Sequence, residues 1–163
     1  MFNRILLAVD GTPSTEAAVD FATALAAQGG AAVRVVHVNE LLVGGRGFAV
    51  ETEREAMAVV DDSVASLRSA GIEADGVHYL ANCFTVEWRI VEAAHEWQAD
   101  VIVVGSTRRR RFRLLRGTNM RERITARTGL PVLTAPAPLL LGGTVRVSEL
   151  VEDQPVKEPS LAG

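Results

Sequence analysis

Two short segments far apart in the chain each follow an apolar run with residues that suit a ligand site. Asp10-Gly11 follows the first run and Gly105-Ser106 follows the second. In open α/β sheets, ligands bind outside the carboxyl ends of the parallel strands. There, Asp10 could accept hydrogen bonds from a base amine or a ribose hydroxyl, and Gly105 would let a ligand approach the backbone. The alternative is that Asp10 is a structural hydrogen-bond acceptor or a helix cap.

A third feature, Gly117-Thr118, precedes a short helix that we predict over about residues 118–127. The free N–H groups and the positive dipole at a helix N-terminus attract phosphate. Thr118 could donate to a phosphate oxygen, or it could simply cap the helix. Taken with Asp10 and Gly105, this pair predicts a concave crevice that attracts anions.

The segment that contains this third feature is strongly basic. Nine arginines but a single acid, Glu122, lie between residues 108 and 127, although the whole chain has 17 Lys+Arg against 20 Asp+Glu and a net charge of −3. Such a local positive field attracts anions, and guanidinium groups bind phosphate bidentately. We therefore expect a nucleotide or another polyanion to bind at Arg108–Arg116.

Other common chemistries find little support in the sequence. His37, His78 and His95 show no metal-ligand spacing, so no metal site is expected. The chain has no Gly-x4-Gly-Lys phosphate loop and no Gly-x-Ser-x-Gly elbow. Because no general base stands out either, we expect no catalytic residue and at most slow nucleotide hydrolysis. In the sequence, Trp88 and Trp97 lie away from the arginine-rich run, which argues against a nucleic-acid platform.

The elements that must position these residues alternate between strands and helices. Apolar runs predict strands over residues 4–9, 32–38, 72–80, 100–105 and 130–135, and apolar residues at helical spacing predict a helix in each interval. Thr12 should cap the first helix, Gly29-Gly30 should end it, and the glycine-rich segment Leu41–Ala49 should be a mobile loop. The alternation predicts a single-domain, open doubly wound α/β fold: a parallel sheet of five strands with helices on both faces.

Length and composition fit one domain with an extension. The chain has 163 residues, near the usual size of a domain. Its pattern of elements breaks after Pro136, so we expect a domain over 1–136 and a C-terminal extension over 137–163 that is partly disordered. The apolar runs are far shorter than the roughly 20 residues of a membrane helix, and the N-terminus does not resemble a signal peptide. With Cys83 as the single cysteine, we expect a cytoplasmic protein without a membrane partner.

Several blocks of the chain, from Asn3 to about Ala135, resemble the universal stress protein family in order and spacing. The blocks are Ile-Leu-Leu-Ala-Val-Asp-Gly-Thr at 5–12, Val-Arg-Val-Val-His-Val at 33–38, Ala-Asp-Val-Ile-Val-Val-Gly-Ser at 99–106, Gly-Thr at 117–118 and Leu-Pro-Val-Leu at 130–133. The resemblance implies the strand order 3-2-1-4-5, a cytoplasmic homodimer and a role in stress adaptation. We expect the dimer to pair the last strand, Leu130–Ala135, with its copy.

Some members of that family bind ATP and others do not. In the ATP-binding members the base lies near the ends of the first two strands, and the phosphates lie in the motif Gly-x2-Gly-x9-Gly-Ser/Thr. The resemblance thus implies a site for ATP, with Mg²⁺, made of Ala8, Val9, Asp10, Val38, Gly105, Arg108, Gly117, Thr118 and Asn119. However, Arg108 replaces the second glycine, and the second spacer is one residue short. An arginine resists both a positive φ and close packing over a phosphate.

Two functions are therefore compatible with the sequence. In the first, the chain is a nucleotide-binding and stress-signalling module in which the arginines replace the missing backbone cradle. In the second, it is a dimeric interaction protein that binds no nucleotide and uses the arginine-rich loop to bind acidic partners or polyanions.

Overall fold

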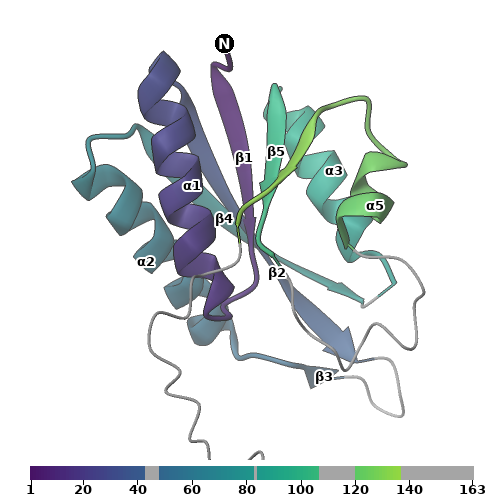
Figure 1. The fold of residues 1–163 in the computed structure, drawn as a ribbon. Coiled ribbons are helices and arrows are strands. Elements are labelled where there is room, and N and C mark those ends of the chain that lie inside the picture. The colour runs from purple at the N-terminus through teal and green to yellow at the C-terminus, as the bar shows by residue number, and fades with distance from the viewer. Residues whose placement is uncertain (43–47, 83, 107–119, 137–163) are drawn as a thin grey trace, which may run out of the picture.

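The structure, a computed structural model, describes residues 1–42, 48–82, 84–106 and 120–136 (Figure 1). The predicted extension over 137–163 lies outside these residues. The elements along the chain are β1 (Arg4–Val9), α1 (Ser14–Gly29), β2 (Ala32–Leu42), β3 (Phe48–Ala49), α2 (Glu53–Ser69), β4 (Ala74–Asn82), α3 (Val86–Glu96), β5 (Val101–Val104), α5 (Met120–Thr125) and β6 (Val132–Thr134). Within the described ranges, no helix is both long enough and apolar enough to cross a membrane.

Five of the strands run parallel in one sheet. β1 is central: it pairs with β2, where Val9 lies beside His37, and with β5, where Ala8 lies beside Val104. β4 pairs with β2, and β6 pairs with β5. The parallel strands therefore lie in the order β4-β2-β1-β5-β6, which is the predicted order 3-2-1-4-5 when the predicted strands are counted along the chain. The predicted fold class is confirmed.

A sixth strand lies in the segment that we predicted to be a loop. β2 continues as far as Leu42, and β3 pairs antiparallel with its last two residues. Leu41 pairs with Ala49 of β3 and also with Asn82 of β4, so β3 must lie on the opposite edge of β2, beyond the end of β1. The loop prediction over Leu41–Ala49 is therefore wrong at both ends. The glycines between 44 and 47 dominated the composition, whereas the flanking residues complete the sheet.

Helices cover both faces of the sheet. α1 and α2 lie on one face, and α3 and α5 lie on the other (Figure 1). Ile5 and Leu7 of β1 are buried toward the first pair of helices, and Leu6 is buried toward the second. A central strand that is buried on both sides needs apolar residues at every position, which explains why its sequence does not alternate.

The ends of two helices follow the local sequence closely. α1 ends at Gly29 and is capped by Gly30, which is left-handed at φ 67° and donates its N–H to the Ala26 carbonyl, as predicted from the glycine pair. α2 begins with a capping box in which Thr52 N–H donates to Glu55 at 2.7 Å and Glu55 N–H donates to Thr52 Oγ1 at 3.3 Å. The hydrogen bonds from Thr52 lower the pKa of Glu55. They also fix the backbone directly after Glu51.

Candidate functional site

The ends of β1 and β5 meet at the first turn of α1. A Cβ placed on Gly105 would lie 3.5 Å from Ser14 Oγ and 3.8 Å from Ala18 Cβ, which are ordinary contacts. Ser14 Oγ in turn lies 2.7 Å from Thr12 Oγ1, which donates to Asp10. Two of the predicted segments, Asp10-Gly11 and Gly105-Ser106, therefore come together at one edge of the sheet.

Asp10 is tied down through one of its two carboxylate oxygens. Its Oδ1 accepts hydrogen bonds from Thr12 N–H at 3.1 Å, Thr12 Oγ1 at 2.5 Å and Thr15 Oγ1 at 3.4 Å. None of the hydrogen bonds among the described residues ends on Oδ2. The Thr12 side chain therefore does not cap α1 as predicted, because its hydroxyl donates to Asp10; the helix begins at Ser14, after Pro13. Asp10 is therefore a structural hydrogen-bond acceptor, as the alternative prediction for this residue had it.

The other site residues that the family resemblance implies at these strand ends are largely buried. Val9 is 7% exposed and packs toward α1 and α2, whereas Val38 is 8% exposed and packs with Ala8 toward α3. A ligand at this edge would therefore contact these residues through their backbone atoms more than through their side chains.

The remaining predicted contacts lie outside the described residues. They are Arg108, Gly117, Thr118 and Asn119, together with the rest of the range Arg108–Arg116. The phosphate half of the predicted site thus stays a prediction, while the half formed by β1, β2 and β5 has a described geometry.

A histidine, a glutamate and an asparagine at the same edge were missed by sequence reasoning. His37, only 2% exposed, lies on β2 with Nδ1 3.0 Å from the Val9 carbonyl and Nε2 2.6 Å from Glu51 Oε2. Asn39 binds the backbone of Glu51 on both sides, donating to its carbonyl at 2.7 Å and accepting from its N–H at 3.2 Å. The available signal was a histidine on a buried strand, since a buried polar group needs a partner.

The strand ends offer few metal ligands. Across the described ranges, no three His, Cys, Asp or Glu side chains lie close enough together to hold a metal ion. His37 and His78 are neighbours in the register of β2 and β4, but both ring nitrogens of His37 already have partners. A Mg²⁺ ion that accompanied a nucleotide here would take most of its ligands from the phosphates and from water.

Part of the predicted positive field is neutralised by an acid from another helix. Arg123 Nε and Arg127 Nη2 lie 3.6 Å and 3.5 Å from Glu87 Oε1, on a side chain of α3 that is 5% exposed. Arg121 Nε donates to the Val132 carbonyl at 3.3 Å. Glu122 is the one acid within the segment, but Glu87 from outside it also opposes two of the arginines. These arginines hold α5 against α3 and β6, so the predicted anion attraction rests on the arginines that precede α5, which lie outside the described residues.

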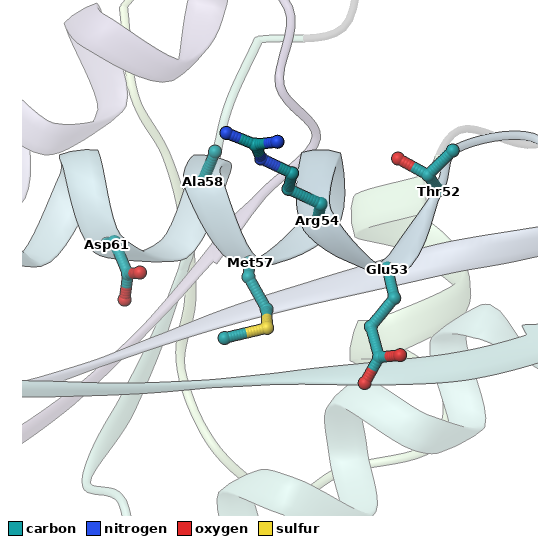
Figure 2. A pocket seen from close by; sticks show the side chains of 6 residues that line it. All are labelled: Thr52, Glu53, Arg54, Met57, Ala58 and Asp61. Carbon is teal, nitrogen blue, oxygen red and sulfur yellow. The ribbon is translucent and has the colours of Figure 1, made fainter.

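A hollow elsewhere on the surface has a different character. It has a volume of about 590 Å³ and follows the outer face of α2 (Figure 2). It is lined by Thr52, Glu53, Arg54, Met57, Ala58 and Asp61. None of these is a predicted site residue, and all six are exposed. We therefore place the candidate site at the strand ends, where the polar residues converge, and not in this open hollow.

An open doubly wound sheet, with polar residues gathered where its central strands end, defines a class of α/β proteins that bind ligands at that edge. The sequence pattern of the universal stress protein family matches residues 1–136. The chain belongs to that family.

Solved structures of universal stress proteins share the fold. A family member from Burkholderia pseudomallei is 25% identical, with a TM-score of 0.65 over 83% of this chain and 96% of that one. The universal stress protein from Archaeoglobus fulgidus in complex with dAMP is 24% identical, with a TM-score of 0.62 over 82% and 98%. A family protein from Arabidopsis thaliana with AMP bound is 14% identical, with a TM-score of 0.56 over 81% and 90%. Among curated proteins, none matches the chain.

Proposed function

We propose that this chain is a nucleotide-binding module that holds an adenine nucleotide, ATP in the first instance, at the carboxyl ends of β1, β2 and β5. The observation that carries the proposal is the meeting of Asp10 with Gly105 through Ser14 and Thr12. The hydrogen bonds of Asp10 all end on Oδ1, so Oδ2 has no hydrogen-bond partner among the described residues. A ribose hydroxyl or a base amine is a donor that this oxygen would accept.

The phosphates would extend toward the arginine-rich segment. In this proposal Gly117-Thr118 and Asn119 offer N–H groups, and Arg108 replaces the missing glycine with a guanidinium group that binds phosphate. Relatives with dAMP, cAMP and AMP support an adenine nucleotide as the ligand class. Mg²⁺ would accompany the triphosphate.

We further propose that the chain acts by binding, in stress signalling, and not by rapid hydrolysis. In this proposal Asp10, which is held by Thr12 and Thr15 through Oδ1, binds the ligand through Oδ2 and activates no water. The proposed homodimer would form along β6 (Val132–Thr134), which pairs only with β5 in the described sheet and so leaves its other edge for a second copy.

A second function is favoured by one specific observation. Arg108 stands where the glycine motif needs a residue that tolerates close packing. A chain that could not close over phosphates would instead use its arginine-rich segment as a docking surface for acidic proteins or other polyanions, still as a dimer.

Thermal unfolding in the presence of ligands separates the two functions, because a ligand that binds only the folded state stabilises it. The nucleotide-binding function predicts that AMP and ATP raise the Tm, whereas an acidic peptide with the same charge as ATP does not. A Tm that rises with the acidic peptide and with inorganic polyphosphate, but not with AMP, would favour the interaction protein.

A further inference from the structure

We propose that His37 and Glu51 share a proton, and that the hydrogen bonds of this protonated pair position the strand end Val9–Asp10. Ligand binding at the carboxyl ends of the strands then requires the protonated pair. The ligand part of this inference rests on the proposed function. The pair itself rests on two contacts of one buried ring: Nδ1 to the Val9 carbonyl at 3.0 Å and Nε2 to Glu51 Oε2 at 2.6 Å.

The two contacts of His37 determine how many protons the pair must hold. The Val9 carbonyl can only accept, so Nδ1 must carry a proton. The contact between Nε2 and Glu51 needs a second proton, either on the ring or on the carboxyl group. If one of these protons is lost, either Nε2 faces the Glu51 carboxylate with no hydrogen between them, or Nδ1 faces the Val9 carbonyl in the same way. Loss of one proton therefore always breaks one of the two hydrogen bonds.

The backbone of Glu51 is held beside His37, while its side chain is 28% exposed. Asn39 binds both its N–H and its carbonyl group, and the capping box of Thr52 and Glu55 fixes the next residue. His37 is the buried member of the pair, because its side chain is 3% exposed. The strain of an unprotonated pair would therefore pass to the Val9 carbonyl, one residue before Asp10.

Several charged and titratable groups surround the pair. Asp10 follows β1, and His78 of β4 is the register neighbour of His37. On α2, Glu55 is bonded to Thr52, while Glu53 and Arg54 are exposed (Figure 2). The acids of the packed helix α1, Glu16 and Asp20, are exposed. Among the described residues, Asp10 and His78 are thus the titratable groups next to the pair along the strands.

Glu51→Gln tests the proposal because an amide can replace the shared proton. The glutamine NH₂ donates to a neutral Nε2 while Nδ1–H still donates to Val9, so both hydrogen bonds survive at every pH. Glu53→Gln, two residues further along and exposed, removes the same charge without touching His37. AMP affinity is measured for all three proteins across the range in which histidine side chains titrate. The titration of the AMP phosphate is common to all of them.

We expect AMP affinity in the wild type and in Glu53→Gln to fall by roughly tenfold more than in Glu51→Gln as pH rises, as the loss of one hydrogen bond to a charged group implies. A Glu51→Gln profile parallel to that of the wild type would overturn the proposal.

Nitrogen-15 spectra of the His37 ring test the protonation of the His37–Glu51 pair without any ligand. The expected result is that the His37 ring nitrogen resonances and the Asp10 amide resonance of the wild type shift together when the pair loses its proton, while in Glu51→Gln the Asp10 amide does not shift. An Asp10 amide resonance that stays unchanged while the His37 ring resonances shift would overturn the proposal. If no protein binds AMP but the amide follows the titration, the proposed function fails and the positioning pair stands.

Discussion

Glu87 of α3 and Arg127, just after α5, form an ion pair at 3.5 Å across the interface of two helices. Arg123 joins the same carboxylate oxygen at 3.6 Å, and Arg127 also lies over the Trp88 ring, 4.9 Å from its centre. The pairing places two arginines of the basic segment in a structural role. It also holds α5, which directly follows the predicted phosphate motif.

Glu87→Gln should therefore destabilise the protein. It leaves Arg123 and Arg127, which are 16% and 28% exposed, without their acid. Breaking a buried ion pair is strongly destabilising, and we expect a loss of about 2 kcal/mol in the free energy of unfolding, since Arg127 is partly solvated. Urea unfolding followed by tryptophan fluorescence measures it. The matched control is Glu92→Gln on the same helix, 57% exposed and paired with Arg89, which should cost less than about 0.5 kcal/mol.

Gly76→Ala should also destabilise the fold, for a steric reason. A Cβ at Gly76 would overlap Val60 Cγ1 and lie 2.9 Å from Val64 Cγ2, both on α2. Overpacking of this kind typically costs about 1–3 kcal/mol. Gly129→Ala is the control, because a Cβ there meets nothing within 4 Å. Equal Tm values for the two variants would contradict the packing of α2 on β4.

Asp100 should make stability depend on acid pH. It accepts from Asn3 N–H at 2.6 Å and Arg4 N–H at 2.9 Å, and these hydrogen bonds lower its pKa. A carboxyl group with a lowered folded pKa stabilises the protein above its ordinary pKa, and the contribution disappears as pH falls through the folded pKa. Asp100→Ala should therefore cost about 1 kcal/mol at pH 7. The difference from wild type should shrink below about pH 4. A difference that stays constant down to low pH would refute the role of the charge.

Two substitutions of Asp10 separate its structural role from its proposed role in binding. Asp10→Asn keeps an oxygen for Thr12 and Thr15, so its Tm should stay near that of the wild type, while its nucleotide affinity falls because the charge is lost. Asp10→Ala removes the acceptor of the hydrogen bonds from Thr12, so it should lose about 1–2 kcal/mol of stability as well. If Asp10→Asn binds AMP as tightly as the wild type, the carboxylate does not contact the ligand.

The fold was predictable because its signals are local and repeated. Apolar runs such as Ile5–Val9 and Val101–Val104 could only be buried strands, and the alternation with helices restricts the topology. Gly30 ended α1 as expected. The loop prediction over Leu41–Ala49 failed because β3 gains its stability from pairing with β2, and local composition does not reveal a two-residue strand.

The candidate site was predictable only in part. Asp10 and Gly105 follow strands that become neighbours, so their proximity follows from the topology. His37 and Glu51 meet because β3 pairs with the part of β2 that extends beyond the end of β1. That path of the chain depends on tertiary pairing. Glu87 neutralises arginines on another element for the same reason: a charge count along the sequence cannot show which helices pack together.

A calorimetric titration of the wild-type protein with ATP and Mg²⁺, repeated with Asp10→Asn, tests whether the ends of β1 and β5 hold an adenine nucleotide. We expect saturable binding of one nucleotide per chain, with a Kd on the order of micromolar that weakens in the variant. No heat up to roughly 1 mM ATP, equivalent to a binding free energy weaker than about −4 kcal/mol, would contradict it.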